Sequence, residues 1–114
     1  MKYQILQVML TDAEVDKIND EGHDAVERHA MKLKMDFSKD AGGIASRMYG
    51  QGYYDHVANI TADNLEGVFT TGNIGPEENI ERLDRMSSVS VGDLVIDEDG
   101  NKNVVASSGF QEVF

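Results

Sequence analysis

Hydrophobic and polar positions at the start of the chain predict a strand followed at once by a helix. Residues 2–10 are rich in Tyr, Ile, Val and Leu, which is typical of a strand in the interior of a sheet. Thr11, with Glu14 three residues later, has the spacing of a capping box, in which each side chain bonds the other residue's backbone N–H group. We therefore expect a helix over 12–21 that ends at Gly22.

The next segment carries two conflicting signals. Residues 31–37 alternate apolar and polar side chains, as a strand does. However, the segment is built of strong helix formers, and Val26, Ala30 and Leu33 lie on one helical face. We expect a helix over 24–35, although the choice between helix and strand is left to the tertiary structure.

The middle of the chain predicts a series of short elements. Gly-rich polar sequence indicates a loop, aromatic and β-branched residues favour a strand, and residues that suit an N-cap precede a helix. The expected elements are a loop over 38–43, a helix over 44–49, a strand over 53–60 with Tyr54, His56, Ala58 and Ile60 on one face, and a helix over 63–70 capped by Thr61 or Asp63.

Glycine and proline then mark a turn over 72–76, with a further helix expected from Pro76. Proline suits the first helical position, and the two acids that follow it suit the positive end of the helix dipole. In this helix we expect Ile80 and Leu83 to be buried, with Arg82 and Arg85 towards the end.

The last part of the chain predicts a β-hairpin. Two apolar runs, 94–96 and 104–107, flank a polar turn in which Gly100 is expected to have a positive φ. The final residues, GFQEVF, are expected to form a last strand or an extended tail. Together these elements predict a single acidic α+β domain over 1–114, with a short mixed or antiparallel sheet, a C-terminal β-hairpin and several short helices.

Composition removes several classes of function. The chain has no cysteine, which excludes disulfides, thiolate zinc sites and cysteine nucleophiles. No apolar run approaches the roughly 20 residues that a membrane span requires, and the N-terminus lacks the pattern of a signal peptide. We therefore expect a cytoplasmic protein without a membrane partner.

The net charge is −11, from 21 acidic and 10 basic residues, and it is unevenly distributed. Residues 12–28 carry −5, residues 61–92 and 93–114 carry −4 each, and residues 29–60 carry +1. Such a charge argues against direct binding of nucleic acid. Two interpretations stay open: a solvated acidic surface that keeps the protein in solution, or a surface that meets a basic partner or imitates a nucleic acid.

No pattern in the sequence nominates a catalytic, cofactor-binding or metal-binding residue. His23 and His29 are six positions apart, which on one helix turns them away from each other, so a metal site would need His56 or carboxylates as well. Residues 97–103 resemble a calcium loop but place glycine and glutamate wrongly, so we expect a hairpin turn. The glycine-rich turn at 72–76 is followed by two acids that would repel a phosphate. The serines occur without a nucleophile motif.

One group of residues has the composition of a protein interface. Tyr, Met and Arg, which interfaces favour, surround the glycine-rich bend at 50–52. The candidate interaction surface consists of Arg47, Met48, Tyr49, Tyr53, Tyr54 and His56. The alternative is that Met48 and Tyr54 belong to the core and the others to its boundary.

The C-terminal segment carries a motif with a structural interpretation. Ser88 or Ser90 can bond local backbone, Gly92 permits a tight bend, and Asp93 can accept backbone N–H groups at the turn. The motif then leads the chain into the strand that follows. Further on, Gly109 and Phe110 complete the pattern.

This pattern resembles the C-terminal region of small proteins encoded by phages, prophages and plasmids, including YodL-like domains. The stretch from Tyr53 through GNIGPEE to Arg85 is also similar to a phage group of such proteins, so the resemblance covers roughly the C-terminal half of the chain. It implies an origin in a mobile element, not a particular reaction.

Three classes of function remain. The first is a non-enzymatic accessory protein of phage or mobile-element type, which binds an unidentified host or phage protein through the candidate interaction surface or the acidic helix within 12–28. The second is an acidic nucleic-acid mimic that inhibits a host defence enzyme. The third is a small enzyme with an unrecognised Asp, Glu or His site. A homodimer through an edge strand of the hairpin is a further alternative.

Overall fold

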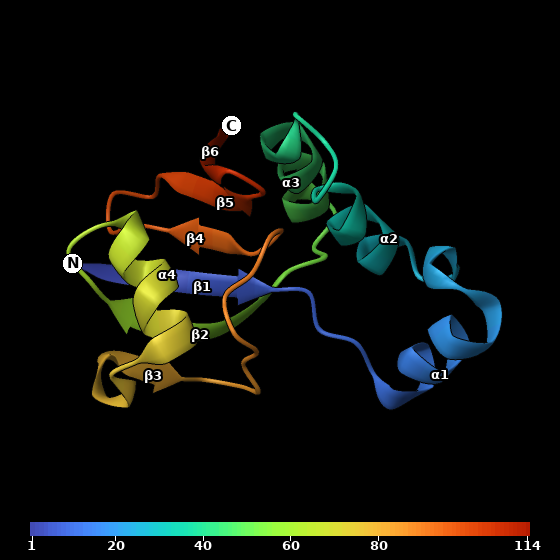
Figure 1. The fold of residues 1–114 in the computed structure, drawn as a ribbon, viewed down its shortest axis with the longest axis horizontal. Helices are drawn as coiled ribbons and strands as arrows, with labels where there is room; N and C mark the ends of the chain where they lie inside the picture. Colours follow the sequence, from blue (N-terminus) through green and yellow to red (C-terminus); the bar gives the residue numbers. More distant parts are fainter.

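The chain folds around an antiparallel sheet in which the first strand lies in the interior. The structure is a computed structural model and describes residues 1 to 114. The sheet has the strand order β3-β2-β1-β4-β5-β6, and every pair is antiparallel (Figure 1). The strands are β1 (Lys2–Gln7), β2 (Asp55–Thr61), β3 (Ile80–Arg82), β4 (Leu94–Ile96), β5 (Lys102–Ala106) and β6 (Gly109–Val113). The α+β class and the interior position of β1 are both confirmed.

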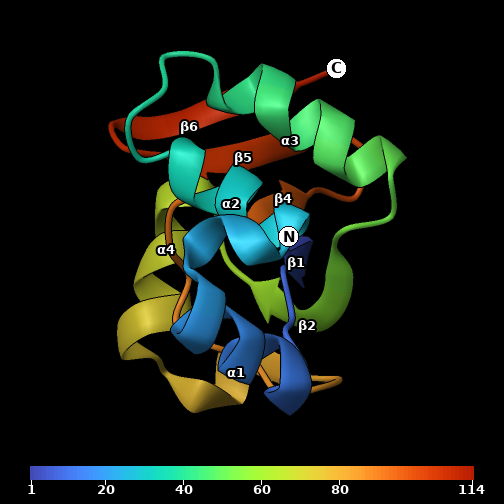
Figure 2. The same cartoon turned by 90° about the vertical axis from the view of Figure 1, so that its right-hand side faces the viewer.

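Helices lie on both faces of this sheet. The helical elements are α1 (Asp12–Glu21), η1 (His23–Ala25), α2 (Glu27–Lys34), α3 (Ala41–Gly50), α4 (Leu65–Ile74) and η2 (Glu77–Asn79), where η marks a 3-10 turn. α2 and α3 lie on one side of the sheet and α4 on the other, while α1 projects away at one end of the molecule (Figures 1 and 2). No helix combines the length and the apolar character that crossing a membrane requires.

Each face of the sheet has its own hydrophobic core. On one face Met48 of α3 is fully buried against the strands, and on the other Val68 of α4 is fully buried. β4 is buried on both faces, because Leu94 and Ile96 join the core beneath α3 and Val95 joins the core beneath α4. This double burial explains why β4 is a continuous apolar run in the sequence.

β2 does not alternate as predicted, because its pairing with β1 contains a β-bulge. Ile5 pairs with Ala58 and Leu6 with His56, so Val57 is the extra residue. Val57 and Ala58 are both fully buried in the core beneath α4, although strict alternation placed them on opposite faces. His56 is exposed and does not share the buried face of Ala58.

The first predicted helix is confirmed and the second is divided. α1 has Thr11 as its N-cap, the capping box with Glu14 is formed, and Gly22 follows the helix with a φ of 99°. The helix expected over 24–35 is instead split into η1 and α2, because Val26 is extended, with φ −123° and ψ 115°, and buried. Helix was the correct choice over strand, but packing of Val26 outweighs helix propensity at this point.

α3 begins inside the segment 38–43 that the sequence predicted to be a loop. Asp40 caps the helix, since its side chain accepts a hydrogen bond from the N–H group of Gly43 at 3.2 Å. Gly42 lies against the backbone carbonyl oxygen of Glu112 in β6, where an added Cβ would collide. Gly42, which favours a loop in the sequence, is therefore needed because α3 packs closely against a strand, whereas Gly43 lies against the capping side chain of Asp40.

α4 also differs from the prediction at both ends. Its N-cap is Asn64, neither Thr61 nor Asp63. The helix continues through the start of the predicted glycine-rich turn, because Gly72 lies against the side chain of Val89 and a Cβ there would collide with it. A close contact between helix and chain again explains a glycine that had indicated a turn.

The helix expected from Pro76 is wrong. The short turn η2 is followed by β3, which pairs with β2. Ile80 is partly buried, but Leu83 is 52% exposed, and Arg82 turns back to bond Glu77. Pairing with the edge of β2 outweighs the helical charge pattern of this segment.

The C-terminal hairpin and the last strand are confirmed. β4 pairs with β5, and Gly100 in the turn between them has a φ of 86°. The carboxylate of Asp97 accepts hydrogen bonds from the N–H groups of Asp99 and Asn101, both at 2.9 Å, which closes the turn. β6 pairs with β5 along the edge of the sheet.

Arg28 ties the projecting α1 back to the rest of the molecule. Its guanidinium donates to the carboxylate of Glu14 at 2.6 Å and to the carbonyl of Met9 at 2.7 Å. The hydrogen bond from Arg28, followed by that from the backbone of Thr11, lowers the pKa of the Glu14 carboxyl to about 2. Residues 12–28, called the acidic arm below, are therefore held by an ion pair at their base.

Replacing Gly42 by alanine should destabilise the protein. Alanine favours a helix more than glycine does, but the new methyl group would meet the backbone of Glu112, which cannot rotate away. Such overpacking costs about 1–3 kcal/mol. Gly50→Ala, in the same helix with open space around it, is the matched control and should be neutral or stabilising. Equal urea midpoints for the two variants would contradict this packing.

The contact between Glu14 and Arg28 should survive mild acid. Because the pKa of Glu14 is lowered from 4.5 to about 2, its contribution to stability is present above pH 4.5 and is lost only as the pH falls through about 2. A carbon-13 titration of the Glu14 carboxyl measures this pKa directly. Arg28→Met should return the titration towards its ordinary range, and an ordinary value in the unmodified protein would rule out the pair.

Candidate functional site

Half of the predicted interaction surface is used inside the fold. Met48 is fully buried. The hydroxyl of Tyr54 donates to the carbonyl of Gly92 at 2.7 Å, and the hydroxyl of Tyr53 donates to the carboxylate of Glu27 at 2.5 Å. These three side chains join α3 and the segment after it to α2 and to the turn before β4.

The other three residues of that surface are exposed and lie on two elements. Tyr49 of α3 is 43% exposed, with the ammonium of Lys102 5.1 Å from the centre of its ring. Arg47 is exposed on the same helix. His56 of β2 contacts the side-chain oxygen of Asn59 at 2.8 Å. An interface at these residues stays a prediction.

The Ser-Gly-Asp motif forms a turn that leads into β4. The carboxylate of Asp93 accepts a hydrogen bond from the N–H group of Ser90 at 2.9 Å, and Gly92 has a φ of 95°. A side chain at Gly92 would also press on Lys32, which crosses over this turn. Ser88 is exposed beside it. The motif therefore forms the tight turn into the next strand that the sequence predicted.

Asp93 is the one fully buried charged residue of the chain. Its Oδ2 atom accepts a hydrogen bond from Nε2 of Gln7 at 3.0 Å, and its Oδ1 atom lies 3.4 Å from the ammonium of Lys32. Burial raises the pKa of this carboxyl, and the charge of Lys32 opposes the rise. Oδ1 has no other partner, so Lys32 alone compensates it.

Ser90 and Lys32 approach each other but do not suit nucleophilic catalysis. The ammonium of Lys32 is 3.5 Å from the hydroxyl of Ser90, which is the pairing of a serine–lysine dyad. The same ammonium is already engaged in an ion pair with the buried carboxylate of Asp93, 3.4 Å away. The arrangement is that of a structural ion pair.

His23 and His29 lie together, contrary to the prediction from their spacing. Nδ1 of His23 is 3.1 Å from Nε2 of His29, and the ring centres are 5.3 Å apart. The prediction was wrong because Val26 interrupts the helix between them. No group of three His, Cys, Asp or Glu side chains able to hold a metal ion is present, and His56 lies on β2.

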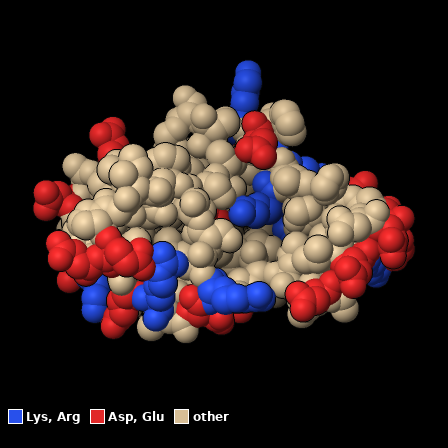
Figure 3. All heavy atoms as spheres, turned by 60° about the horizontal axis from the view of Figure 1, so that its bottom comes forward, with Lys and Arg blue, Asp and Glu red and all other residues tan.

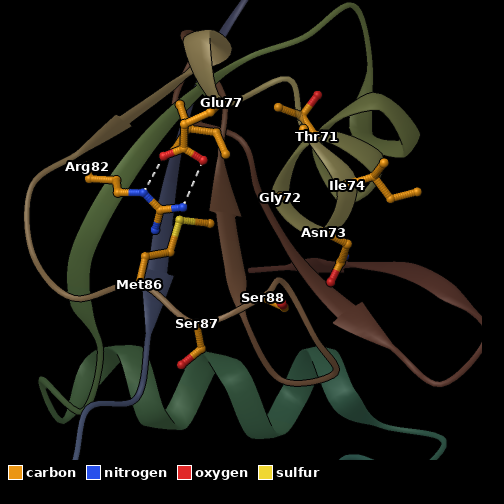
Figure 4. A pocket seen from close by; sticks show the side chains of 11 residues that line it. Thr71, Gly72, Asn73, Ile74, Glu77, Arg82, Met86, Ser87 and Ser88 are labelled. Carbon is orange, nitrogen blue, oxygen red and sulfur yellow. Dashed lines mark hydrogen bonds and ion pairs between the residues drawn. The ribbon is translucent and has the colours of Figure 1, made fainter.

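A polar hollow of about 230 Å³ lies beyond the C-terminal end of α4. Figure 4 shows Glu77 and Arg82 facing each other at this hollow, joined by hydrogen bonds of 2.6 and 3.0 Å. Its other polar lining includes Thr71, Asn73, Ser87 and Ser88. The hydrogen bond from Arg82 lowers the pKa of Glu77, and the paired guanidinium is not free to bind an anion.

A larger apolar groove opens on the face of the sheet that carries α4. It has a volume of about 550 Å³ and lies between α4, the segment 89–91 and the hairpin of β5 and β6. The only charged residue in its lining is Glu66. Its apolar lining consists of Phe69, Val89, Val91, Val105, Ala106 and Phe110. These residues define the apolar groove.

The groove exists because α4 covers only part of its face of the sheet. The contacts of α4 are with β2, which lies next to the edge strand β3. Val105 of β5 and Phe110 of β6 belong to the same core, but they lie near the other edge, beyond the helix. Phe69 of α4 lines the groove between the helix and these two strands, and its side chain remains 43% exposed.

The part of the sheet formed by β1, β2 and β3 is also free of a covering helix on the face away from α4, but its side chains are polar. On the face away from α4, the amide of Asn59 donates to Glu81 at 2.6 Å, and Lys2 lies 3.7 Å from the same carboxylate. His56 extends this row through Asn59. Water can satisfy such a surface, whereas the groove leaves the apolar side chains of Phe69, Val91 and Phe110 partly exposed to it.

The sequence did not predict this groove. Phe69 falls within the helix predicted over 63–70, and Phe110 enters the sequence analysis only as part of the terminal motif. The alternation of Ser88, Val89, Ser90 and Val91 is the one signal that could have indicated an extended wall with an apolar side. Which helix and which strands this wall would meet depends on the tertiary structure.

Replacing Lys32 by methionine should destabilise the protein strongly. The change leaves the buried carboxylate of Asp93 unpaired, and breaking such a pair costs about 3 kcal/mol. Lys34→Met, an exposed lysine of the same helix, is the control and should change little. The folded pKa of Asp93 is raised, and a protonated carboxyl no longer needs the ammonium of Lys32. The loss in free energy of unfolding caused by Lys32→Met, the deficit, should therefore shrink as the pH falls through that pKa. Urea unfolding at several pH values measures it, and a deficit that does not depend on pH would contradict the assignment.

Comparison of the chain with protein-family models, with curated protein sequences and with solved structures finds no match. Its function is therefore inferred from the arrangement of its own residues.

Proposed function

We propose that the protein acts by binding another protein, which places an apolar segment flanked by Lys or Arg in the apolar groove. The observation that carries the proposal is an apolar groove of about 550 Å³ beside α4, in which Phe69, Val91 and Phe110 remain partly exposed. Aromatic side chains around a hollow are typical of the centre of protein interfaces. Phe69 and Phe110 supply them here.

The charge around the groove favours a basic partner. Glu66 lines one side. Gln111 bonds α3 and Val113 joins the core beneath α3, so Phe110 and Glu112, which alternate with them along β6, point to the groove side. No Lys or Arg lines the groove. A segment with Lys or Arg beside its apolar residues would thus meet opposite charge at both rims.

The same charges argue against a second copy of this chain as the occupant. A copy placed with its groove against the first would bring Glu66 and Glu112 of each copy near those of the other. Two chains with a net charge of −11 each would also repel at longer range. Self-association is therefore an outcome for the experiment below to detect.

The positions of the acidic residues give less support to nucleic-acid mimicry. A mimic requires carboxylates in continuous rows, like phosphates. The acidic arm lies at one end of the molecule and β3 with its acidic neighbours at the other (Figure 1). Figure 3 shows acidic groups gathered towards both ends of one face, with uncharged atoms over much of the body between them.

A binding role fits the accessory proteins of phages and plasmids that the C-terminal motif resembles. On that basis we place the partner among host or phage proteins in the cytoplasm of a host cell. The proposal requires no cofactor and no reaction at the groove.

Selection of random peptides displayed on phage, with the full chain as bait, tests the proposal. We expect peptides that combine apolar residues with Lys or Arg and that shift the amide signals of Val91, Val105 and Phe110. Phe69→Ser should weaken their binding at least tenfold. Ile74→Ser is the matched control, because Ile74 lies on the same helix, is 86% exposed and does not line the groove.

Four results would overturn the proposal. Peptides could shift signals of the acidic arm or of residues 47–56 instead, or their binding could persist in Phe69→Ser. A fatty acid such as decanoate could shift the groove signals while no peptide does, which would make the groove a small-molecule site. Dimerisation that Phe69→Ser abolishes would assign the groove to a second copy.

A further inference from the structure

We propose that His23 and His29 form a two-histidine clip that binds one divalent transition-metal ion of the class of Zn²⁺, Ni²⁺ and Cu²⁺. Nδ1 of His23 lies 3.1 Å from Nε2 of His29. An ion binds the nitrogen of an imidazole at about 2.0–2.1 Å. If the angle between the two nitrogen–metal bonds is about 90° to 109°, the two nitrogens lie about 2.9–3.4 Å apart. The two nitrogens are already at this separation.

The backbone brings the two rings together from two different elements. Gly22, with a φ of 99°, ends α1 and lets η1 begin at His23. Val26 is extended and buried between η1 and α2, which carries His29. Arg28 bonds the carbonyl of Met9 and fixes the start of α2. Anchored neighbours therefore fix the backbone positions from which the two rings meet.

The surroundings favour a bound cation. His23 is exposed and His29 partly buried, so an ion can reach both rings from solvent. The acidic arm that contains His23 carries −5, which raises the local concentration of cations. Burial and the neighbouring His23 lower the pKa of His29, which favours the neutral imidazole that ligates metals.

The clip would hold the ion with two protein ligands. No third His, Cys, Asp or Glu completes a group with the pair, so water fills the remaining coordination positions. We therefore expect a dissociation constant in the micromolar range, weaker than that of a four-ligand structural site. Because the ion would join η1 to α2, its binding should also stiffen the connection to α1.

Titration of the full chain with zinc chloride at pH 7.5 tests the clip. We expect one ion per chain by calorimetry, together with shifts of the ring nitrogen signals of His23 and His29. His23→Ala and His29→Gln should each weaken binding at least tenfold, and glutamine keeps a hydrogen-bonding group without the imidazole ligand. His56→Ala is the matched control, since His56 contacts Asn59 on β2, and it should bind zinc as the unmodified protein does.

The same titration can overturn the proposal. The proposal fails if zinc shows no saturable binding, or if both variants bind zinc as tightly as the unmodified protein does. The contact would then be only a hydrogen bond between two imidazoles. Loss of binding in His56→Ala would move the site elsewhere. Circular dichroism of each variant shows whether it is folded, and His29→Gln keeps the test valid if His23→Ala is not. Protection of residues 12–25 from hydrogen exchange should increase with zinc only where the clip is intact.

Discussion

The carboxylate of Asp93 is the charge around which the fold is arranged. It is fully buried, and an unpaired charge in such a position would cost several kcal/mol, so its partners must be held in place. Gln7 at the end of β1, the backbone of Ser90 and the ammonium of Lys32 supply them. Gln7 also bonds both backbone groups of Ser87, so one carboxylate connects the central strand, the approach to β4 and α2.

The helices divide between the two faces of the sheet. Lys32 holds the end of α2 over the turn into β4, and α3 follows on the same face. α4 packs on the opposite face, where it contacts β2. Each face of the sheet therefore has a region without a covering helix, and the side chains of the two regions differ. The polar one suits water, and the apolar one is the groove in which we propose that a partner binds.

The sequence predicted those elements whose signals are local. The α1 capping box, the Gly100 turn and the interior position of β1 rest on neighbouring residues, and the structure confirms them. The predictions that failed rest on distant partners. Pairing with β2 made a strand of Ile80 to Arg82, and close packing of Gly42 on β6 made a helix start in a predicted loop. Of the site, Asp93 was predicted as a turn residue, but its burial and the partner Lys32 were not.

The buried pair and the groove are not independent, because they share the segment 89–91. Ser90 bonds Asp93 through its N–H group, whereas Val91 lines the groove and packs against both cores. A wall fixed in this way offers a partner a surface that does not have to be ordered on binding, which reduces the entropic cost of association. Weakening the pair of Lys32 and Asp93 should therefore loosen the wall of the groove as well as the fold. An interaction site built on loops alone would lack this coupling, and in this chain the stability of the core and the shape of the proposed binding surface depend on the same carboxylate.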